Sequence, residues 1–107
     1  MKNLITVLVL SIALFSYQDT VAQKADYFTV SGYYFAMTKS SFEKFSKILT
    51  DKDYVAATKL INSGEIAKLP EGVPVYLEDT SWGLVKIRAY GMTETFWTYA
   101  EALVKNN

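Results

Sequence analysis

The chain contains no cysteine but carries many aromatic residues. Its 107 residues include eight tyrosines, six phenylalanines and two tryptophans, and all of these except Phe15 and Tyr17 lie after residue 22. Without disulfides, a small domain depends on its hydrophobic core for stability. Each buried aromatic side chain removes ~150–250 Å² of surface from water. We therefore expect most of these aromatic residues to lie in the core.

The first 22 residues have the three parts of a secretory signal peptide. Lys2 supplies a basic start, residues 4–15 form an almost continuous apolar run, and residues 20–22 (Thr-Val-Ala) supply small residues before a cleavage site. The apolar run is shorter than the ~20 residues that span a bilayer, and an uncleaved anchor or a buried core helix are the alternatives. We expect cleavage before Gln23, a periplasmic or secreted protein, and no membrane span after cleavage.

Residues 23–107 are expected to form one small α+β domain that begins with a strand and a helical hairpin. Residues 27–37 are rich in aromatic and β-branched residues, which favours a strand, and Gly32 within them indicates a bulge or a close backbone approach. Ser40 to Glu43 has the form of a capping box for a helix over about 41–50. Asp51 or Asp53 would cap a second helix over about 53–62, and Gly64 would end it. The expected buried faces of the two helices are Phe42, Phe45, Ile48 and Leu49, and Tyr54, Ala57, Leu60 and Ile61.

The hydrophobic period changes to two in the second half of the domain, about residues 66–104, which predicts a sheet. Short strands are expected at 66–69, 73–78, 85–88 and 94–98, with a loop at 79–83. A second capping-box pattern, Thr98 to Glu101, predicts a short helical turn after the last of these strands. Leu103 and Val104 would then close the end of a small barrel.

The apolar residues of this sheet follow a known pattern. Val73 and Val75, then Val85-Lys86-Ile87, then Trp97 stand where a bacterial SH3-like domain has its strand residues, so residues 68–103 resemble that family. The family often has glycine directly before the tryptophan, where this chain has Phe96. The resemblance implies a small antiparallel β-barrel. The whole expected domain also resembles small exported bacterial proteins of unknown function, a likeness that implies no activity.

Composition excludes several classes of function. Eleven basic and eleven acidic residues give no net charge, which argues against nucleic-acid binding. Histidine and cysteine are both absent, so the commonest general base, the commonest metal ligand and the thiol nucleophile are missing. No carboxylate spacing specifies a catalytic pair, and Asp51 with Asp53 does not continue into a calcium loop. We therefore expect no enzyme activity, no metal and no cofactor, with a small hydrolase as the remaining catalytic alternative.

One group of residues remains as a candidate for ligand or partner binding. If the alternating apolar residues of the sheet face inward, neighbouring aromatic and basic side chains face outward and form a patch. Its members are Tyr76, Trp82, Lys86, Arg88 and Tyr90. The alternative is that Trp82 folds back over the end of the barrel while the charges form ordinary cross-strand pairs. Trp97 is assigned to the core.

These observations predict an exported, non-catalytic interaction module. Its expected ligand is a peptide, a cell-wall fragment or a partner protein, bound on the aromatic patch. The alternative is an inhibitor or immunity-type protein that blocks a partner enzyme through the helical hairpin or a loop.

Overall fold

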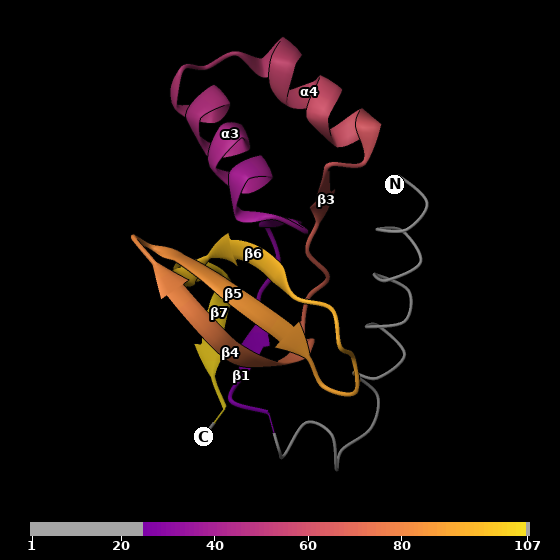
Figure 1. Ribbon diagram of the computed structural model, residues 1–107, viewed down its shortest axis with the longest axis vertical. Helices are drawn as coiled ribbons and strands as arrows, with labels where there is room; N and C mark the ends of the chain where they lie inside the picture. Colours follow the sequence, from indigo (N-terminus) through magenta and orange to yellow (C-terminus); the bar gives the residue numbers. More distant parts are fainter. Residues whose placement is uncertain (1–24, 107) are drawn as a thin grey trace.

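The structure, a computed structural model, describes residues 25–106; the predicted signal peptide lies outside them. It contains two helices and one antiparallel seven-stranded sheet with the strand order β3-β2-β6-β5-β4-β1-β7, which confirms the α+β class (Figure 1). The elements in chain order are β1 (Tyr27–Thr29), β2 (Tyr34–Ala36), α3 (Lys39–Thr50), α4 (Tyr54–Ser63), β3 (Ile66–Lys68), β4 (Pro74–Ser81), β5 (Leu84–Ala89), β6 (Phe96–Tyr99), the 3₁₀ helix η1 (Ala100–Ala102) and β7 (Leu103–Lys105).

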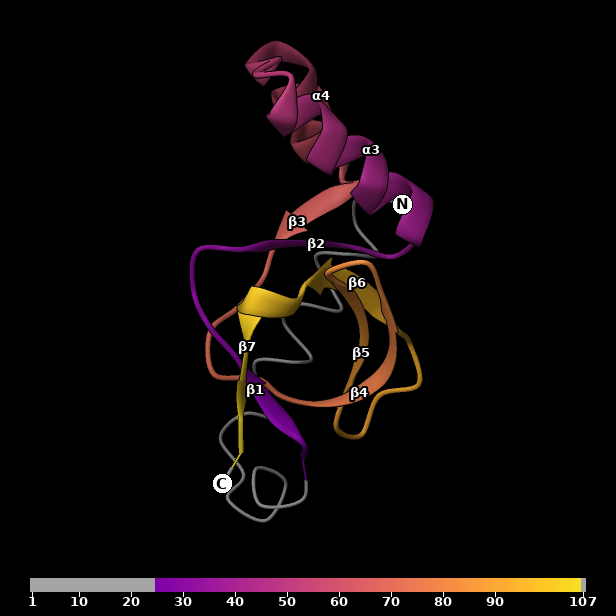
Figure 2. The same cartoon turned by 90° about the vertical axis from the view of Figure 1, so that its left-hand side faces the viewer.

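The sheet curves strongly but is not closed into the barrel that we expected (Figure 2). Its two edges are β3 and β7. The expected single strand over 27–37 is divided, because Gly32 has a φ of 96° and turns the chain between β1 and β2. β1 then pairs with β4 and β7, whereas β2 pairs with β3 and β6. The two edges do not pair with each other, because β3 lies beside the helices and β7 lies at the end of the sheet away from them (Figure 1).

The helical hairpin is present close to its expected boundaries, but the first cap is different. The hydroxyl of Thr38, and not that of Ser40, accepts a hydrogen bond from the backbone N–H of Ser41 at 3.2 Å. Thr38 has the extended backbone typical of a cap residue, so the helix begins before the expected capping box. Asp53 caps α4 by accepting from the Ala56 N–H, and Gly64 ends it with a φ of 85°, as predicted.

The concave face of the sheet encloses the first hydrophobic cluster. Phe35 and Phe96, from the neighbouring strands β2 and β6, meet edge to face with ring centroids 5.0 Å apart. The buried residues of this cluster are Phe35, Leu69, Val73, Val75, Val85, Ile87, Ala89, Phe96 and Ala102. The inward-facing valines and isoleucine of the predicted strands are therefore confirmed as core.

The helical hairpin covers one end of the opposite, convex face and encloses a second cluster. Its buried residues are Ala36, Phe42, Phe45, Ala57, Leu60, Ile66 and Leu84, with Ile48, Leu49 and Ile61 packed against them. Tyr54, expected on the buried face of the second helix, is 63% exposed because it lies in the first turn of α4, outside this cluster. Trp97 packs against the cluster but is only half-buried.

Two buried threonines tie separate parts of the sheet together. The Thr29 hydroxyl donates to the Pro70 carbonyl at 2.6 Å and accepts from the Val73 N–H at 2.9 Å. The Thr98 hydroxyl donates to the Tyr34 carbonyl at 2.7 Å, so Thr98 is not the helix cap that its sequence context predicted. Instead Tyr99 precedes η1, without a capping side chain.

Replacing each threonine with valine keeps the side-chain volume but removes its hydrogen bonds. A buried polar group that loses its partner costs about 1–3 kcal/mol. Thr98→Val removes one hydrogen bond to the backbone and Thr29→Val removes two, so Thr29→Val is expected to lower the free energy of unfolding more. Urea denaturation of both variants measures the difference. Equal losses of unfolding free energy would show that the second hydrogen bond of Thr29 adds no stability.

Candidate functional site

Part of the convex face carries aromatic and charged side chains beyond the area covered by the helices. Tyr76 of β4 lies opposite Arg88 of β5, and Lys86 of β5 lies opposite Trp97 of β6. Residues that are directly opposite in antiparallel strands share a face, and Lys86 and Arg88 are two positions apart. These four side chains therefore lie on one surface. This placement was predicted for Tyr76, Lys86 and Arg88, whereas Trp97 had been assigned to the core. Lys39 at the start of α3 places its ammonium 5.8 Å from the Trp97 ring centroid.

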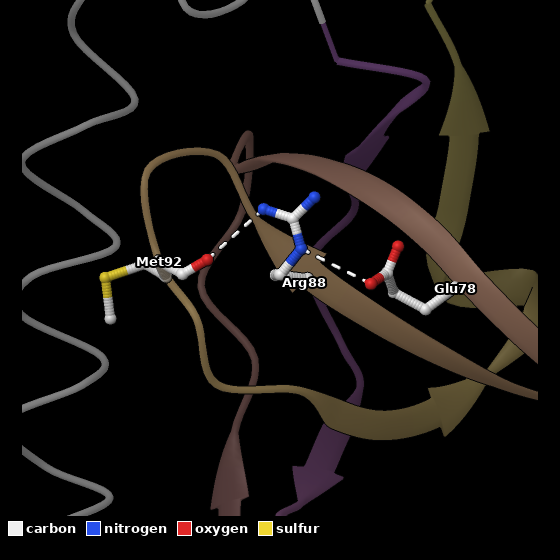
Figure 3. Close-up of polar contacts among 3 residues, drawn as sticks. All are labelled: Glu78, Arg88 and Met92. Atoms are coloured by element: carbon white, nitrogen blue, oxygen red, sulfur yellow. Dashed lines mark hydrogen bonds and ion pairs between the residues drawn. The ribbon is translucent and has the colours of Figure 1, made fainter.

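Arg88 organises one end of this surface. Its guanidinium carbon lies 4.8 Å from the Tyr76 ring centroid, and the Tyr76 ring lies 6.0 Å from that of Tyr90. The same guanidinium reaches a Glu78 carboxylate oxygen at 3.4 Å and donates to the Met92 carbonyl at 3.2 Å (Figure 3). Tyr76, Arg88 and Tyr90 therefore come together as predicted, and Arg88 also holds the connection between β5 and β6.

A β-bulge changes the charge of this surface. The pairing of β4 with β5 shifts between Leu77 and Asp79, so that Asp79 lies opposite Lys86 while Glu78 contacts Arg88. Without the bulge these neighbouring carboxylates would point to opposite faces, which is what their positions in a regular strand predict. Each basic residue of the predicted patch thus has a carboxylate close to it. The surface is aromatic and charge-balanced, and the expectation of a basic patch is corrected.

The role of Arg88 is testable by replacing it with lysine. Arg88→Lys keeps the charge but cannot lie flat on Tyr76 while it also contacts Glu78 and the Met92 carbonyl. We expect a loss of about 1 kcal/mol in the free energy of unfolding, measured with urea. The matched control is Lys86→Arg on the same strand and face, for which a change within about 0.5 kcal/mol is expected. A neutral Arg88→Lys would show that Arg88 is an ordinary surface charge.

Trp82 is separate from the Tyr76 cluster. β4 continues to Ser81 and pairs there with Leu84, so the loop expected at 79–83 shrinks to a two-residue turn made by Trp82 and Gly83. At ~3.3 Å per strand residue, Trp82 lies roughly 15–20 Å from Tyr76 along the hairpin. Its side chain is 100% exposed, so the alternative in which it folds back over the sheet is wrong.

The backbone at Trp82 has an unfavourable conformation for its side chain. Its φ is 52° and that of Gly83 is 80°, the signs required at the two central residues of a type I′ hairpin turn. Asn-Gly and Asp-Gly are the usual sequences there, because residues with bulky side chains rarely adopt positive φ. A tryptophan at this position is both strained and fully hydrated, and such local strain concentrates at functional sites.

A hollow of about 570 Å³ lies between this turn and α3. Trp82, Gly83 and Leu84 line it from the hairpin, and Tyr99 and Glu101 line it from the end of β6 and from η1. The contributions of α3 and the residue after it are Glu43, Ser46, Lys47, Thr50 and Asp51. Apart from Trp82, none of these residues was predicted as a site residue, because no local signal in the sequence shows that α3 packs beside the tip of the β4–β5 hairpin.

Within residues 25–106, no group of three or more carboxylates is placed to hold a metal ion. In the same part of the chain, neither helix combines the length and the apolar character needed to cross a membrane. Comparison with protein-family models, with curated proteins and with solved structures found no match for this chain.

The strain at Trp82 can be measured directly. Trp82→Asn places a residue that accepts positive φ in the same turn, so it is expected to raise the free energy of unfolding by about 1 kcal/mol. The control is Gly83→Ala, which meets no neighbouring atom but is forced to a φ of 80° and is expected to destabilise the protein by a similar amount. A destabilised Trp82→Asn variant would show that the indole supports the fold.

Proposed function

We propose that this protein is an exported module that acts by binding a partner and not by catalysis. The partner is a protein or peptide, or cell-wall material, and Trp82 is the anchor of the contact. The observation that carries the proposal is the fully exposed Trp82 side chain in a left-handed backbone conformation at the tip of a hairpin. A tryptophan there contributes nothing to the core, whereas tryptophan is among the residues that dominate binding energy in interfaces.

The aromatic surface around Tyr76, Arg88 and Tyr90 supports the same proposal. It extends the exposed side of the β4–β5 hairpin away from the turn and presents rings that are already held in place by Arg88. Pre-ordered aromatic side chains lose little conformational entropy on binding. We propose that the strands β3 to β6 are SH3-like in arrangement. We also propose that this surface binds an extended peptide, as the aromatic groove of a peptide-binding SH3 domain does.

A second candidate is an inhibitor or immunity-type protein. The observation that favours it is the position of Trp82. The two-residue turn presents this residue at the end of a hairpin, where it can enter the cleft of a partner enzyme. Residues 1–22 support an exported location for both candidates, because they have the three parts of a signal peptide.

The proposal is tested by affinity capture from an envelope extract of the source organism. Residues 23–107 are immobilised as the natural sequence, as Trp82→Asn and as Lys59→Gln, an exposed change on α4 away from the hairpin. The natural domain and Lys59→Gln are expected to retain the same protein or wall fragment, and Trp82→Asn is expected to lose at least nine-tenths of it, as ~2 kcal/mol at a central tryptophan implies. Full retention by Trp82→Asn would refute Trp82 as the anchor.

If the captured partner is one enzyme in stoichiometric amount, an activity assay of that enzyme separates the two candidates. An inhibitor lowers its turnover, whereas an interaction module leaves its turnover unchanged.

A further inference from the structure

We propose that the hollow between α3 and the β4–β5 turn binds a basic segment of a partner protein, with a lysine or arginine side chain lying against Trp82. This inference rests on the proposed function, and it adds the place of binding and the chemistry of the partner.

The floor of the hollow is apolar and held firmly. Tyr99 and the buried Leu84 both line it, and the Tyr99 ring meets that of Phe42 edge to face with centroids 4.9 Å apart. The Tyr99 hydroxyl donates to the Ser46 hydroxyl oxygen, or accepts from it, at 2.6 Å, which joins the strand to α3. The shape of the floor is therefore set by the second hydrophobic cluster before any partner arrives.

The rim of the hollow is acidic. Three carboxylates line it, those of Glu43, Asp51 and Glu101, against one ammonium, that of Lys47. Lys47 lies 3.6 Å from Asp51 and one turn away on the same helix, so that pair balances itself. Glu43 and Glu101 have no salt-bridge partner among residues 25–106 and are both exposed. Two negative charges therefore remain for a cation to balance.

An indole and carboxylates that line the same hollow suit a long basic side chain. The aliphatic stem of lysine or arginine packs on apolar and aromatic surface while its charged end stays near water and carboxylates, and the cation itself is attracted to an aromatic face. The Tyr76 surface is a poorer place for such a ligand, because its own Arg88 already occupies the Tyr76 ring and the Glu78 carboxylate. Charge complementarity thus points to the hollow and to a basic partner.

The test uses a short fluorescent peptide of alternating lysine and leucine, with its glutamate–leucine counterpart as a second probe. The rim variant carries the two substitutions Glu43→Gln and Glu101→Gln, which remove two negative charges from the edge of the hollow. The control variant carries Glu71→Gln and Glu94→Gln, which remove two negative charges from exposed positions outside the hollow. Fluorescence anisotropy is measured at low and at high salt, and circular dichroism confirms that each variant is folded.

The lysine peptide is expected to bind the natural protein, more weakly at high salt. The rim variant is expected to weaken its binding about fivefold, as two exposed charge contacts imply, and the control variant to leave it unchanged. Trp82→Asn is expected to weaken it as well. Absence of binding, equal binding of the glutamate peptide, or equal losses in the rim and control variants would overturn the proposal.

This failure is distinguishable from failure of the proposed function. If Trp82→Asn loses the captured partner while the rim variant retains it, binding through Trp82 stands and the basic chemistry of the partner is wrong. If Trp82→Asn retains both the partner and the peptide, both proposals fall.

Discussion

The pairing of β2 with β6 is the contact on which both hydrophobic clusters depend. Adjacent residues of β2 point to opposite faces, so Phe35 enters the cluster inside the curved sheet while Ala36 enters the cluster under the helices. The buried hydroxyl of Thr98 fixes β6 to β2 through the Tyr34 carbonyl. A small domain without disulfides depends on apolar burial for its stability, and this pair of strands contributes buried residues to a cluster on each face of the sheet.

The periodic parts of this fold could be predicted from the sequence, but the long-range arrangement could not. The helical hairpin and the inward-facing residues of β4 and β5 follow from periods of 3.6 and two, which are local properties of the chain. At Gly32 the sequence predicted only a bulge or a close backbone approach. The local sequence does not show that the chain divides there into two strands that pair with different neighbours. For the same reason the sequence predicted closure into a barrel, whereas β3 and β7 remain open edges.

The candidate site shows the same limit. Alternation along β4 and β5 correctly brought Tyr76, Arg88 and Tyr90 together, because these residues need only a regular hairpin to meet. The bulge at Glu78 broke that regularity and placed carboxylates beside the basic residues. The hollow beside Trp82 needs α3 to pack next to the hairpin turn, a tertiary contact between segments more than 30 residues apart that no pattern in either segment encodes.

An open sheet leaves backbone groups at both edges that another chain could pair with. Here each edge strand is only three residues long, and the two strands end in Lys68 and Lys105. Short edges with a lysine offer a neighbouring molecule few hydrogen bonds and place positive charges close together when two copies meet. The protein thereby gains resistance to edge-to-edge aggregation without closing its sheet.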